Sequence, residues 1–365
     1  MANIYRAEVV GSLQRPGYLT DAQKQQKAGT MSAAAFKRIE DRAVDEAIAL
    51  QEEVGVDVLT DGEQRRFHFR DLLTRDVEGL SPIKAPPIRL QGMPGHENIE
   101  RSDPLTVTGK LRLKRSVATE EFVYARGKTR KPLKIALPHP FTYRLMYGPE
   151  SRQVYPDPFE LFHDAALLLL QEARELANLG CEYIQIDAPV LTLPLDPKYS
   201  DYFATLNIPS ERFIEEGVKI MDVIADVPGV KFSVHYCRGN SPTHYFSGVG
   251  YDAAAKVLFQ GSKKVDSYLL EYDDWRAGSF EALQFVPRDK EIVLGLVSSM
   301  KYPQVESVED LVARVEEAAQ YFPKENMALS PQCGFCSMVG VEGFDASVQK
   351  AKLKQVVAAA RRIWH

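Results

Sequence analysis

Two hydrophobic periods alternate along the chain from Leu133 onward, and few folds accommodate that pattern. Short β-branched segments with the two-residue period of strands are separated by longer segments with the 3.6-residue period of amphipathic helices. Repeated strand–helix units build a parallel sheet, and two further segments nearer the N-terminus bring the expected strands to eight, enough for a (β/α)₈ (TIM) barrel. The expected strands span residues 7–12, 56–62, 133–138, 182–188, 231–237, 267–272, 292–298 and 328–333.

The length of 365 residues and the hydrophobic content of 45% suit one large α/β domain with a single core. We therefore expect residues 1–365 to form one TIM-barrel domain. Residues 80–131 interrupt the rhythm with several prolines and glycines. Strand-like runs at 105–113 and 121–124 predict that this stretch is a β-hairpin inserted after the second strand.

The insertion is rich in basic residues, and their role has two interpretations. They form either a solvated face of a hairpin that covers the barrel, or a docking patch for an acidic partner protein. The residues are Lys110, Arg112, Lys114, Arg115, Arg126, Lys128, Arg130 and Lys131.

Charge and hydropathy exclude several classes of partner. The chain carries 45 basic and 50 acidic residues without a global basic face, so nucleic acid is not an expected partner. The first twelve residues lack the apolar core of a signal peptide, and no apolar run is long enough to span a bilayer. We expect a cytoplasmic protein. Its four cysteines are too sparse for a disulfide scaffold, which favours metal binding or core packing.

Reactive side chains fall repeatedly at the C-terminal ends of the expected strands, where barrel enzymes place their active sites. They are Gly11, Ser12, Asp61, Glu63, Asp187, His235, Cys237, Glu271, Asp273, Ser298, Ser299 and Cys333. The two-residue period places His235 and Cys237 on the same side of one strand, so an imidazole and a thiolate can share an ion there. Taken singly, each is better explained as an ordinary buried core residue.

Glu271 and Cys333 extend this pair to a set of two thiolates, one imidazole and one carboxylate. Such a set suits tetrahedral Zn²⁺ far better than Mg²⁺ or Ca²⁺. The predicted zinc ligands are His235, Cys237, Glu271 and Cys333. Cys336, in a C-x-x-C turn with Cys333, is an alternative ligand, and Cys181 is expected in the core.

Five separated motifs, in order along nearly the whole chain, resemble the catalytic half of cobalamin-independent methionine synthase and its short single-barrel relatives. They are Val10-Gly11-Ser12, Asp61-Gly62-Glu63, Gln185-Ile186-Asp187-Ala188-Pro189, His235-x-Cys237 with Glu271, and Pro331-Gln332-Cys333-Gly334. The resemblance implies that Glu63 and Asp187 hold the amino group of homocysteine. It also implies that the backbone around Val10, Gly11 and Ser12 holds the carboxylate.

The sequence departs from the family pattern at positions associated with the methyl donor. Ala188 replaces an acid after the aspartate, and Leu193 stands where a pterin-binding glutamate is expected, so methylfolate binding is not predicted. The loop 298–302 lacks the histidine that the long enzymes use as a candidate proton donor. These features resemble short relatives that include corrinoid-dependent methionine synthases and epoxyalkane:coenzyme M transferases.

We expect a zinc-activated thiol to act as nucleophile, since coordination deprotonates a thiol at neutral pH. The leading hypothesis is methyl transfer to homocysteine from an external donor such as a methyl-corrinoid protein. Glu271, the hardest ligand, is expected to yield its position when the thiol arrives. The oligomeric state is not indicated by the sequence.

Two alternatives stay open. In the first, a coenzyme M thiolate attacks an epoxide, and Lys301, Tyr302 or His139 protonates the leaving oxygen. The arginines and histidine after Glu63, at Arg65, Arg66, His68 and Arg70, would then bind an anionic thiol or donor, unless they are ordinary surface charges. In the second alternative the zinc is only structural.

Overall fold

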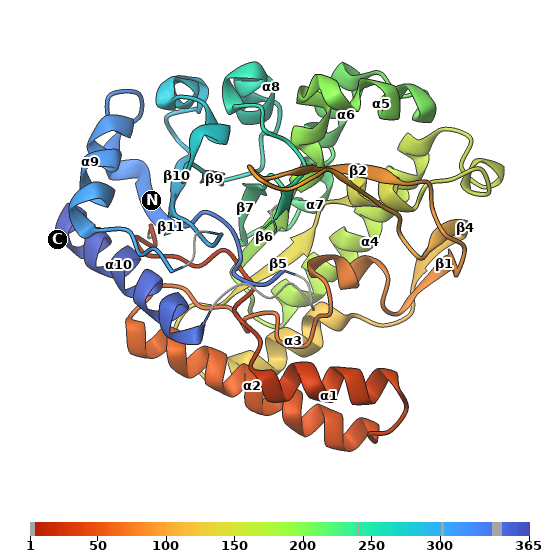
Figure 1. The fold of residues 1–365 in the computed structure, drawn as a ribbon, viewed down its shortest axis with the longest axis horizontal. Coiled ribbons are helices and arrows are strands. Elements are labelled where there is room, and N and C mark those ends of the chain that lie inside the picture. Colours follow the sequence, from red (N-terminus) through yellow and green to blue (C-terminus); the bar gives the residue numbers. More distant parts are fainter. Residues whose placement is uncertain (1–3, 240, 242, 301–302, 338–344) are drawn as a thin grey trace.

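The centre of the molecule is a six-stranded, wholly parallel sheet (Figure 1). The computed structural model describes residues 4–239, 241, 243–300, 303–337 and 345–365. The strands are β5 (Lys134–Pro138), β6 (Tyr183–Asp187), β7 (Lys231–Tyr236), β9 (Ser267–Glu271), β10 (Glu291–Val297) and β11 (Met327–Pro331), in the order β11-β10-β9-β7-β6-β5. Nearly every residue in them is buried, as expected for a parallel sheet covered on both faces.

Two N-terminal segments occupy the remaining barrel positions without forming regular strands. Ala7 makes an isolated parallel bridge to Leu329 beside β11, and Leu59 makes one to Leu133 beside β5. The amide of Asp57 donates to the carbonyl of Ala7 at 2.9 Å, which joins the two segments to each other. The predicted barrel order is therefore confirmed, but the regular strands expected at 7–12 and 56–62 are reduced to single bridges.

Helices surround the sheet, and the long ones begin and end where the sequence provides caps (Figure 1). Ser32, Asp157 and Ser307 accept backbone N–H bonds at the N-termini of α2 (Ala33–Val54), α4 (Pro158–Asn178) and α9 (Val308–Ala318). The other α-helices are α1 (Gly17–Lys27), α3 (Val117–Arg126), α5 (Ser200–Leu206), α6 (Ser210–Lys219), α7 (Met221–Ile224), α8 (Ala255–Gln260) and α10 (Ala346–Trp364).

Short 3₁₀ helices fill many of the loops, several of them directly after a sheet strand. They are η1 (Phe69–Leu73), η2 (Pro140–Met146), η3 (Ser151–Gln153), η4 (Pro189–Leu195), η5 (Pro197–Tyr199), η6 (Tyr251–Ala253), η7 (Trp275–Ala277), η8 (Phe280–Phe285) and η9 (Lys324–Asn326). Because η2, η4 and η7 follow β5, β6 and β9, they lie on the side of the sheet where the reactive side chains gather.

The insertion is more elaborate than the predicted hairpin. β1 (Val77–Ser81) pairs antiparallel with β4 (Thr106–Leu113), whereas β2 (Ile88–Gly92) pairs with β3 (Ile99–Arg101) and with the distant β8 (His244–Tyr245). The strand expected at 121–124 is wrong, because these residues lie in α3. Ser116 caps that helix, and its buried residues recur at helical spacing, which outweighs the local strand propensity.

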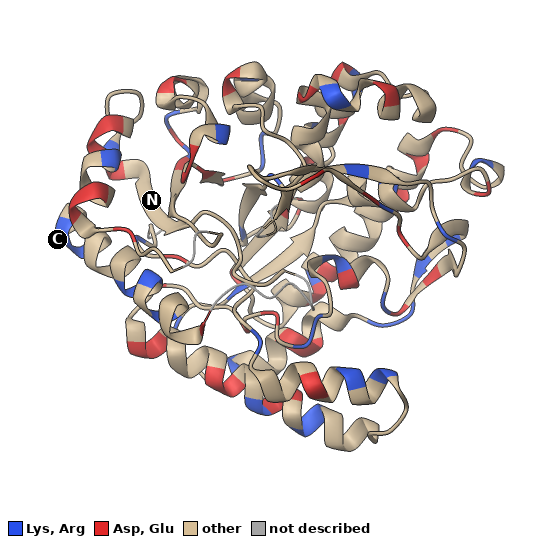
Figure 2. Cartoon of the chain, viewed as in Figure 1, with Lys and Arg blue, Asp and Glu red and all other residues tan. Residues whose placement is uncertain are grey.

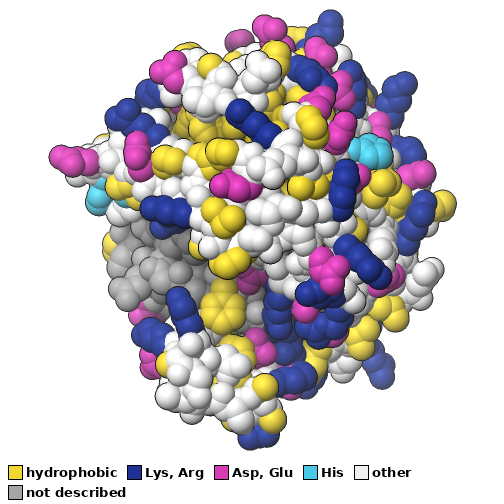
Figure 3. Space-filling view, turned by 90° about the vertical axis from the view of Figure 1, so that its right-hand side faces the viewer, with side chains coloured by type: hydrophobic (Ala, Val, Ile, Leu, Met, Phe, Trp, Pro, Cys, Tyr) yellow, Lys and Arg dark blue, Asp and Glu magenta, His cyan; other side chains and the backbone are white. Residues whose placement is uncertain are grey.

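Four of the eight basic residues named above in the insertion form ion pairs with carboxylates. Lys110, Arg115 and Lys128 form ion pairs with Asp164, Asp76 and Asp45, respectively. Both signs of charge are interspersed over this side of the molecule (Figures 2 and 3). This pairing favours the solvated-face interpretation over a docking patch. Among the described residues, no helix is both long and apolar enough to cross a membrane.

Candidate metal centre and pocket

Four side chains from three strand ends converge on one point. His235 lies near the end of β7 and Cys237 directly follows that strand, while Glu271 is the last residue of β9 and Cys333 follows β11. All four are buried, and each offers one ligand atom within 4.8 Å of the others. The two sulfur atoms are 3.4 Å apart, and His235 Nε2 lies 3.8 Å from Glu271 Oε1. The structure thus brings together the four predicted ligands.

The imidazole of His235 is oriented as a metal ligand. Its Nδ1 lies 3.3 Å from the carbonyl oxygen of Leu269, a bond in which Nδ1–H is the donor. Burial lowers the pKa of His235 to about 3, so the ring is neutral at physiological pH. Nε2 is buried and has no hydrogen-bond partner within the described part of the chain. A neutral imidazole with one nitrogen held by a carbonyl and the other turned to the cluster is the usual arrangement at a metal.

The Cys333 thiol disfavours negative charge unless a cation joins it. The pKa of Cys333 is raised well above its usual range by the adjacent Cys237 thiol, by burial and by the Glu271 carboxylate. The amide of Gly239 donates to Cys237 Sγ at 3.2 Å, which orients this sulfur. A divalent ion would offset the repulsion between two thiolates and a carboxylate, so the residues present fit Zn²⁺.

The other two cysteines do not join the cluster. The sulfur of Cys336 accepts from Arg15 Nη1 at 3.1 Å and does not belong to the group of four converging ligands. Cys181 is buried at the start of its barrel segment and donates to the carbonyl of Tyr183, as predicted for a core residue. Cys333 is therefore the better ligand of the C-x-x-C pair.

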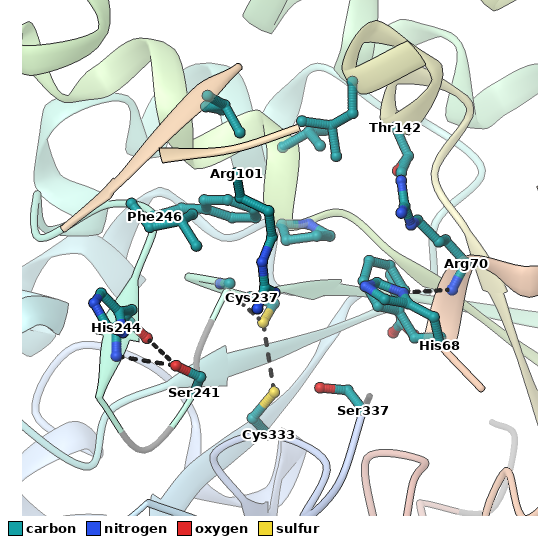
Figure 4. Close-up of a pocket in the computed structure, with 18 of the residues that line it drawn as sticks. His68, Arg70, Arg101, Thr142, Cys237, Ser241, His244, Phe246, Cys333 and Ser337 are labelled. Carbon is teal, nitrogen blue, oxygen red and sulfur yellow. Dashed lines mark hydrogen bonds between the residues drawn. The ribbon is translucent and has the colours of Figure 1, made fainter. Parts of the chain in front are cut away.

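A pocket of about 420 Å³ opens beside the cluster (Figure 4). Most of the predicted site residues line it: Val10, Ser12, Glu63, Asp187, His235, Cys237 and Cys333. They come from the C-terminal side of the sheet, as the barrel interpretation requires. Figure 4 shows Cys237 and Cys333 facing each other across this space.

Two buried carboxylates form one wall of the pocket. Burial raises the pKa of Glu63 to about 8, and the neighbouring Asp187 adds to that rise. Burial also raises the pKa of Asp187 to about 6, although Gln185 donates an amide N–H to its Oδ1 at 2.7 Å. Two carboxyl groups with raised pKa values in one cavity indicate a site that is completed by a cationic group.

Backbone conformation holds Glu63 in place. Glu63 adopts a left-handed conformation with φ of 52° after Gly62, whose φ is 70°. Its carboxylate presses against the backbone of Gly11, where an added Cβ would overlap Oε1. Gly11 therefore positions Glu63, even though Gly11 itself does not line the pocket.

Another part of the pocket lining forms a cationic wall. His68, Arg70 and Arg101 line the pocket, and Arg70 forms an ion pair with Asp103, which also lines it (Figure 4). Burial lowers the pKa of His68, and the charges of Arg70 and Arg101 lower it further. Arg101 lies on β3 of the insertion, so no local sequence signal connected it with the barrel.

Arg65 and Arg66, predicted as substrate-binding residues, do not line the pocket. Arg65 pairs with Asp41 on α2. Arg66 is buried and donates to both carboxylate oxygens of Glu121, at 3.2 and 2.6 Å. Their partners come from helices α2 and α3, which local sequence could not associate with this loop.

The candidate proton donors lie elsewhere or outside the described residues. Lys301 and Tyr302 belong to the undescribed part. His139 is buried away from the pocket lining: its Nε2 lies 2.9 Å from the Gly217 carbonyl and its Nδ1 accepts from the Phe141 amide. Burial lowers its pKa to about 3, so the ring is neutral near neutral pH, and its one N–H, on Nε2, faces the Gly217 carbonyl rather than the pocket.

The insertion forms a roof over the pocket. Ile88 and Leu90 on β2 and Ile99 on β3 line the cavity. β2 is tied to the loop after Cys237 because Gln91 pairs with Tyr245 on β8. The sequence did not predict this roof, because the pairing joins segments more than a hundred residues apart.

These features define the class of protein: a parallel α/β barrel with a candidate metal centre and an acid-lined pocket at the carboxyl ends of its strands. The chain matches the family model "Cobalamin-independent synthase, Catalytic domain" over residues 6–362, and it belongs to this family, that of the cobalamin-independent methionine synthases.

Individual relatives agree with this assignment. The chain is 32% identical to the uncharacterized protein YxjH of Bacillus subtilis (strain 168), over 99% of this chain and 95% of that protein. It is 24% identical to a methionine synthase of Pyrococcus horikoshii, over 99% and 93% of the two chains. Among solved structures, a putative vitamin-B12-independent methionine synthase from Listeria monocytogenes aligns with a TM-score of 0.72 and 25% identity, over 100% and 99% of the chains.

A B12-independent methionine synthase from Shewanella sp. W3-18-1, solved with selenomethionine, aligns with a TM-score of 0.76, over 99% of this chain and 98% of that one. At 19% identity this likeness shows the fold, and it confirms the TIM-barrel class.

Proposed function

We propose that the protein is a zinc-dependent methyltransferase of the methionine synthase type that methylates homocysteine. The observation that carries the proposal is the presence of Glu63 and Asp187 in the same pocket as the thiolate–imidazole cluster. A pair of carboxylates suits an ammonium group, while the cluster suits a metal-bound thiol, and homocysteine carries both groups. The relatives named methionine synthase support the same reaction.

In the proposed site His235, Cys237, Glu271 and Cys333 would hold zinc, which would favour the thiolate form of the substrate thiol at neutral pH. Glu63 and Asp187 receive the ammonium group, and its charge returns the Glu63 carboxyl to its anionic form. The backbone of Val10 and Ser12 faces the substrate carboxylate. The apolar roof from β2 and β3 excludes water, so the nucleophile reacts with the methyl donor rather than being protonated.

The position of the ligands argues against a purely structural zinc. His235, Cys237 and Cys333 all line the pocket, so a bound ion would face substrate rather than a closed core. The four cysteines are present as thiols, which suits a reducing compartment such as the cytoplasm.

The methyl donor is external to the chain. A methyl-corrinoid protein remains the proposed donor, because Leu193 and Ala188 stand in place of acidic residues of the pterin-binding pattern. Both side chains are buried and apolar.

Titration calorimetry of the zinc-loaded protein with L-homocysteine tests the proposal. We expect binding with proton release, and a loss of affinity of at least tenfold in both Glu63→Gln and Asp187→Asn. Production of methionine from homocysteine and methylcobalamin would complete the test. Absence of homocysteine binding to the zinc-loaded wild type would refute the proposed substrate.

A second candidate is the addition of a coenzyme M thiolate to an epoxide. The observation that favours it is the cationic wall, because Arg70 and Arg101 line the pocket and suit a sulfonate. Coenzyme M titrated in parallel separates the two reactions. Binding of coenzyme M that survives Glu63→Gln and is lost in Arg101→Gln would favour this second reaction.

A further inference from the structure

The carboxylate of Glu271 has a different polar neighbour at each of its two oxygens. Its Oε1 is 3.8 Å from Nε2 of His235, on the side of the metal cluster. Its other oxygen, Oε2, is 3.9 Å from Nε of Arg238. Each distance is longer than a hydrogen bond, so a small shift of the carboxylate toward Arg238 would bring Oε2 within hydrogen-bond range of the guanidinium.

Arg238 is built to receive a carboxylate. It directly follows the ligand Cys237 and is only 1% exposed. One guanidinium nitrogen, Nη1, donates to the carbonyl of Val249, but Nε and Nη2 are buried without a hydrogen-bond partner among the residues that the structure describes. Leaving two donors of a buried cation unsatisfied is costly, and a carboxylate that accepts from both would remove that cost.

Tyr251 fixes both partners of this pair. The guanidinium of Arg238 lies 4.6 Å from the centre of the Tyr251 ring, in a cation–π arrangement. The hydroxyl of the same tyrosine accepts from the backbone amide of Glu271 at 2.9 Å. The Glu271 backbone and the Arg238 side chain are thereby held in register, while the Glu271 carboxylate remains the part that can turn.

The other cation near Glu271 already has a strong partner. Arg276 is attracted electrostatically to Glu271, and Glu271 contributes to the raised pKa of Arg276. The Nε of Arg276, however, donates to both carboxylate oxygens of Asp274, at 2.9 and 3.1 Å. Arg238 therefore has the donors that can take the carboxylate.

We propose that Arg238 is a positioning residue that binds the carboxylate of Glu271, by donating hydrogen bonds to it, when a substrate thiol enters the cluster. This inference rests on the proposed function, in which the thiol joins His235, Cys237 and Cys333. Its sulfur would bring a third thiolate, so retaining Glu271 as well would add a further negative charge to the same point. Transfer of that carboxylate to Arg238 keeps the charge balanced, and the thiol proton leaves to solvent.

The test compares Arg238→Gln and Arg238→Lys with wild type. Zinc affinity without thiol is measured by chelator competition, homocysteine affinity by calorimetry, and zinc ligands by X-ray absorption. For Arg238→Gln we expect zinc affinity within about threefold of wild type but homocysteine affinity about 10- to 100-fold lower, the usual range for loss of a group that orients a ligand. The lysine variant should recover part of the loss.

X-ray absorption at zinc distinguishes a positioning role of Arg238 from a merely structural one, because it reports which atoms bind the metal. In wild type, thiol addition should add one sulfur and remove one oxygen from the zinc shell. In Arg238→Gln the oxygen should remain. An oxygen lost equally in both proteins, or unchanged homocysteine affinity in the variant, would overturn the proposal.

Arg144→Gln serves as the matched control for loss of a buried arginine. Arg144 is also 1% exposed and lies against a tyrosine ring, that of Tyr202, but it contacts none of the cluster residues in the described structure. It should leave the zinc shell and its response to thiol unchanged. A parallel loss of zinc and thiol binding in both arginine variants would mean that Arg238 is merely structural.

A double-variant cycle covers the case in which Arg238→Gln folds poorly. In a Glu271→Gln background no carboxylate needs a partner, so Arg238→Lys should no longer affect thiol affinity; a persisting effect would contradict the proposal. If wild type binds 2-mercaptoethanol but not homocysteine, the proposed function fails, and the same comparison with 2-mercaptoethanol still decides the role of Arg238.

Discussion

The sulfur atoms of Cys237 and Cys333 lie 3.4 Å apart, although 96 residues separate them in the chain. Each thiol follows a different barrel strand, so the closure of the sheet brings them together. The adjacent Cys237 thiol and burial raise the pKa of Cys333, which means that this thiol is protonated in the metal-free protein. A metal must therefore displace at least one proton when it binds.

We predict that zinc affinity rises with pH, by about tenfold per pH unit for each proton released. Chelator competition at pH 6.5, 7.0 and 7.5 measures the slope, and calorimetry in buffers of different ionisation enthalpy counts the protons. Cys333→Ser should abolish stoichiometric zinc binding, whereas Cys181→Ser, a change at the other buried end of the barrel, should leave it intact. Zinc affinity independent of pH would contradict the assigned ligands.

Glu63 makes the stability of the substrate-free protein depend on pH. Its pKa rises from 4.5 to about 8 on folding, so the folded protein holds this proton more tightly than the unfolded chain does. The stability it contributes is complete below pH 4.5 and is lost as pH rises through about 8, because a buried charge replaces a neutral acid.

We therefore predict that Glu63→Gln raises the free energy of unfolding above pH 8, by about 2 to 5 kcal/mol. The difference between variant and wild type should shrink toward pH 5. Urea denaturation at pH 5, 7 and 9 measures it. An equal difference at all three pH values would show that Glu63 ionises normally in the pocket.

The central sheet and the metal ligands were predictable because both follow short-range rules. The two-residue alternation predicted strand β7 and predicted that His235 and Cys237 lie on the same side of it. The expected parallel sheet placed Glu271 and Cys333 at the same end. The sequence could not reveal contacts that depend on distant pairing. The roof arises from β2 pairing with β8, and Arg101 reaches the pocket only through that arrangement.

The same limit explains why the partners of Arg65 and Arg66, and the helix at 121–124, were not predicted. Arg66 was expected to meet substrate, yet it is held by Glu121, a residue expected in a strand but found on the buried face of α3. The two outcomes are linked, because helix α3 supplies the carboxylate that holds Arg66 outside the pocket lining.

The Arg66–Glu121 pair should be a large contributor to stability that is unrelated to metal binding. Both side chains are almost fully buried, with 2% and 1% exposed, so removing one leaves an unpaired buried charge. We predict that Glu121→Ala lowers the free energy of unfolding by about 3 to 5 kcal/mol. The double variant Arg66→Met, Glu121→Leu should lose less, and urea denaturation compares them. Equal losses in single and double variants would argue against the buried-charge explanation.

Gly11 offers the most specific test of how the acid wall is positioned. A methyl group at this position would overlap Oε1 of Glu63, the end of a side chain that can turn away without disturbing the backbone. Gly11→Ala should therefore fold and bind one zinc ion, yet raise the KM for homocysteine at least tenfold, because the carboxylate no longer faces the ammonium group. Gly17→Ala is the matched control, since an added Cβ there meets no atom within 4 Å. Steady-state kinetics with zinc analysis measure both variants. An unchanged KM in Gly11→Ala would mean that Glu63 does not bind the amino group, whereas a parallel loss of zinc would mean that the glycine supports the metal centre instead.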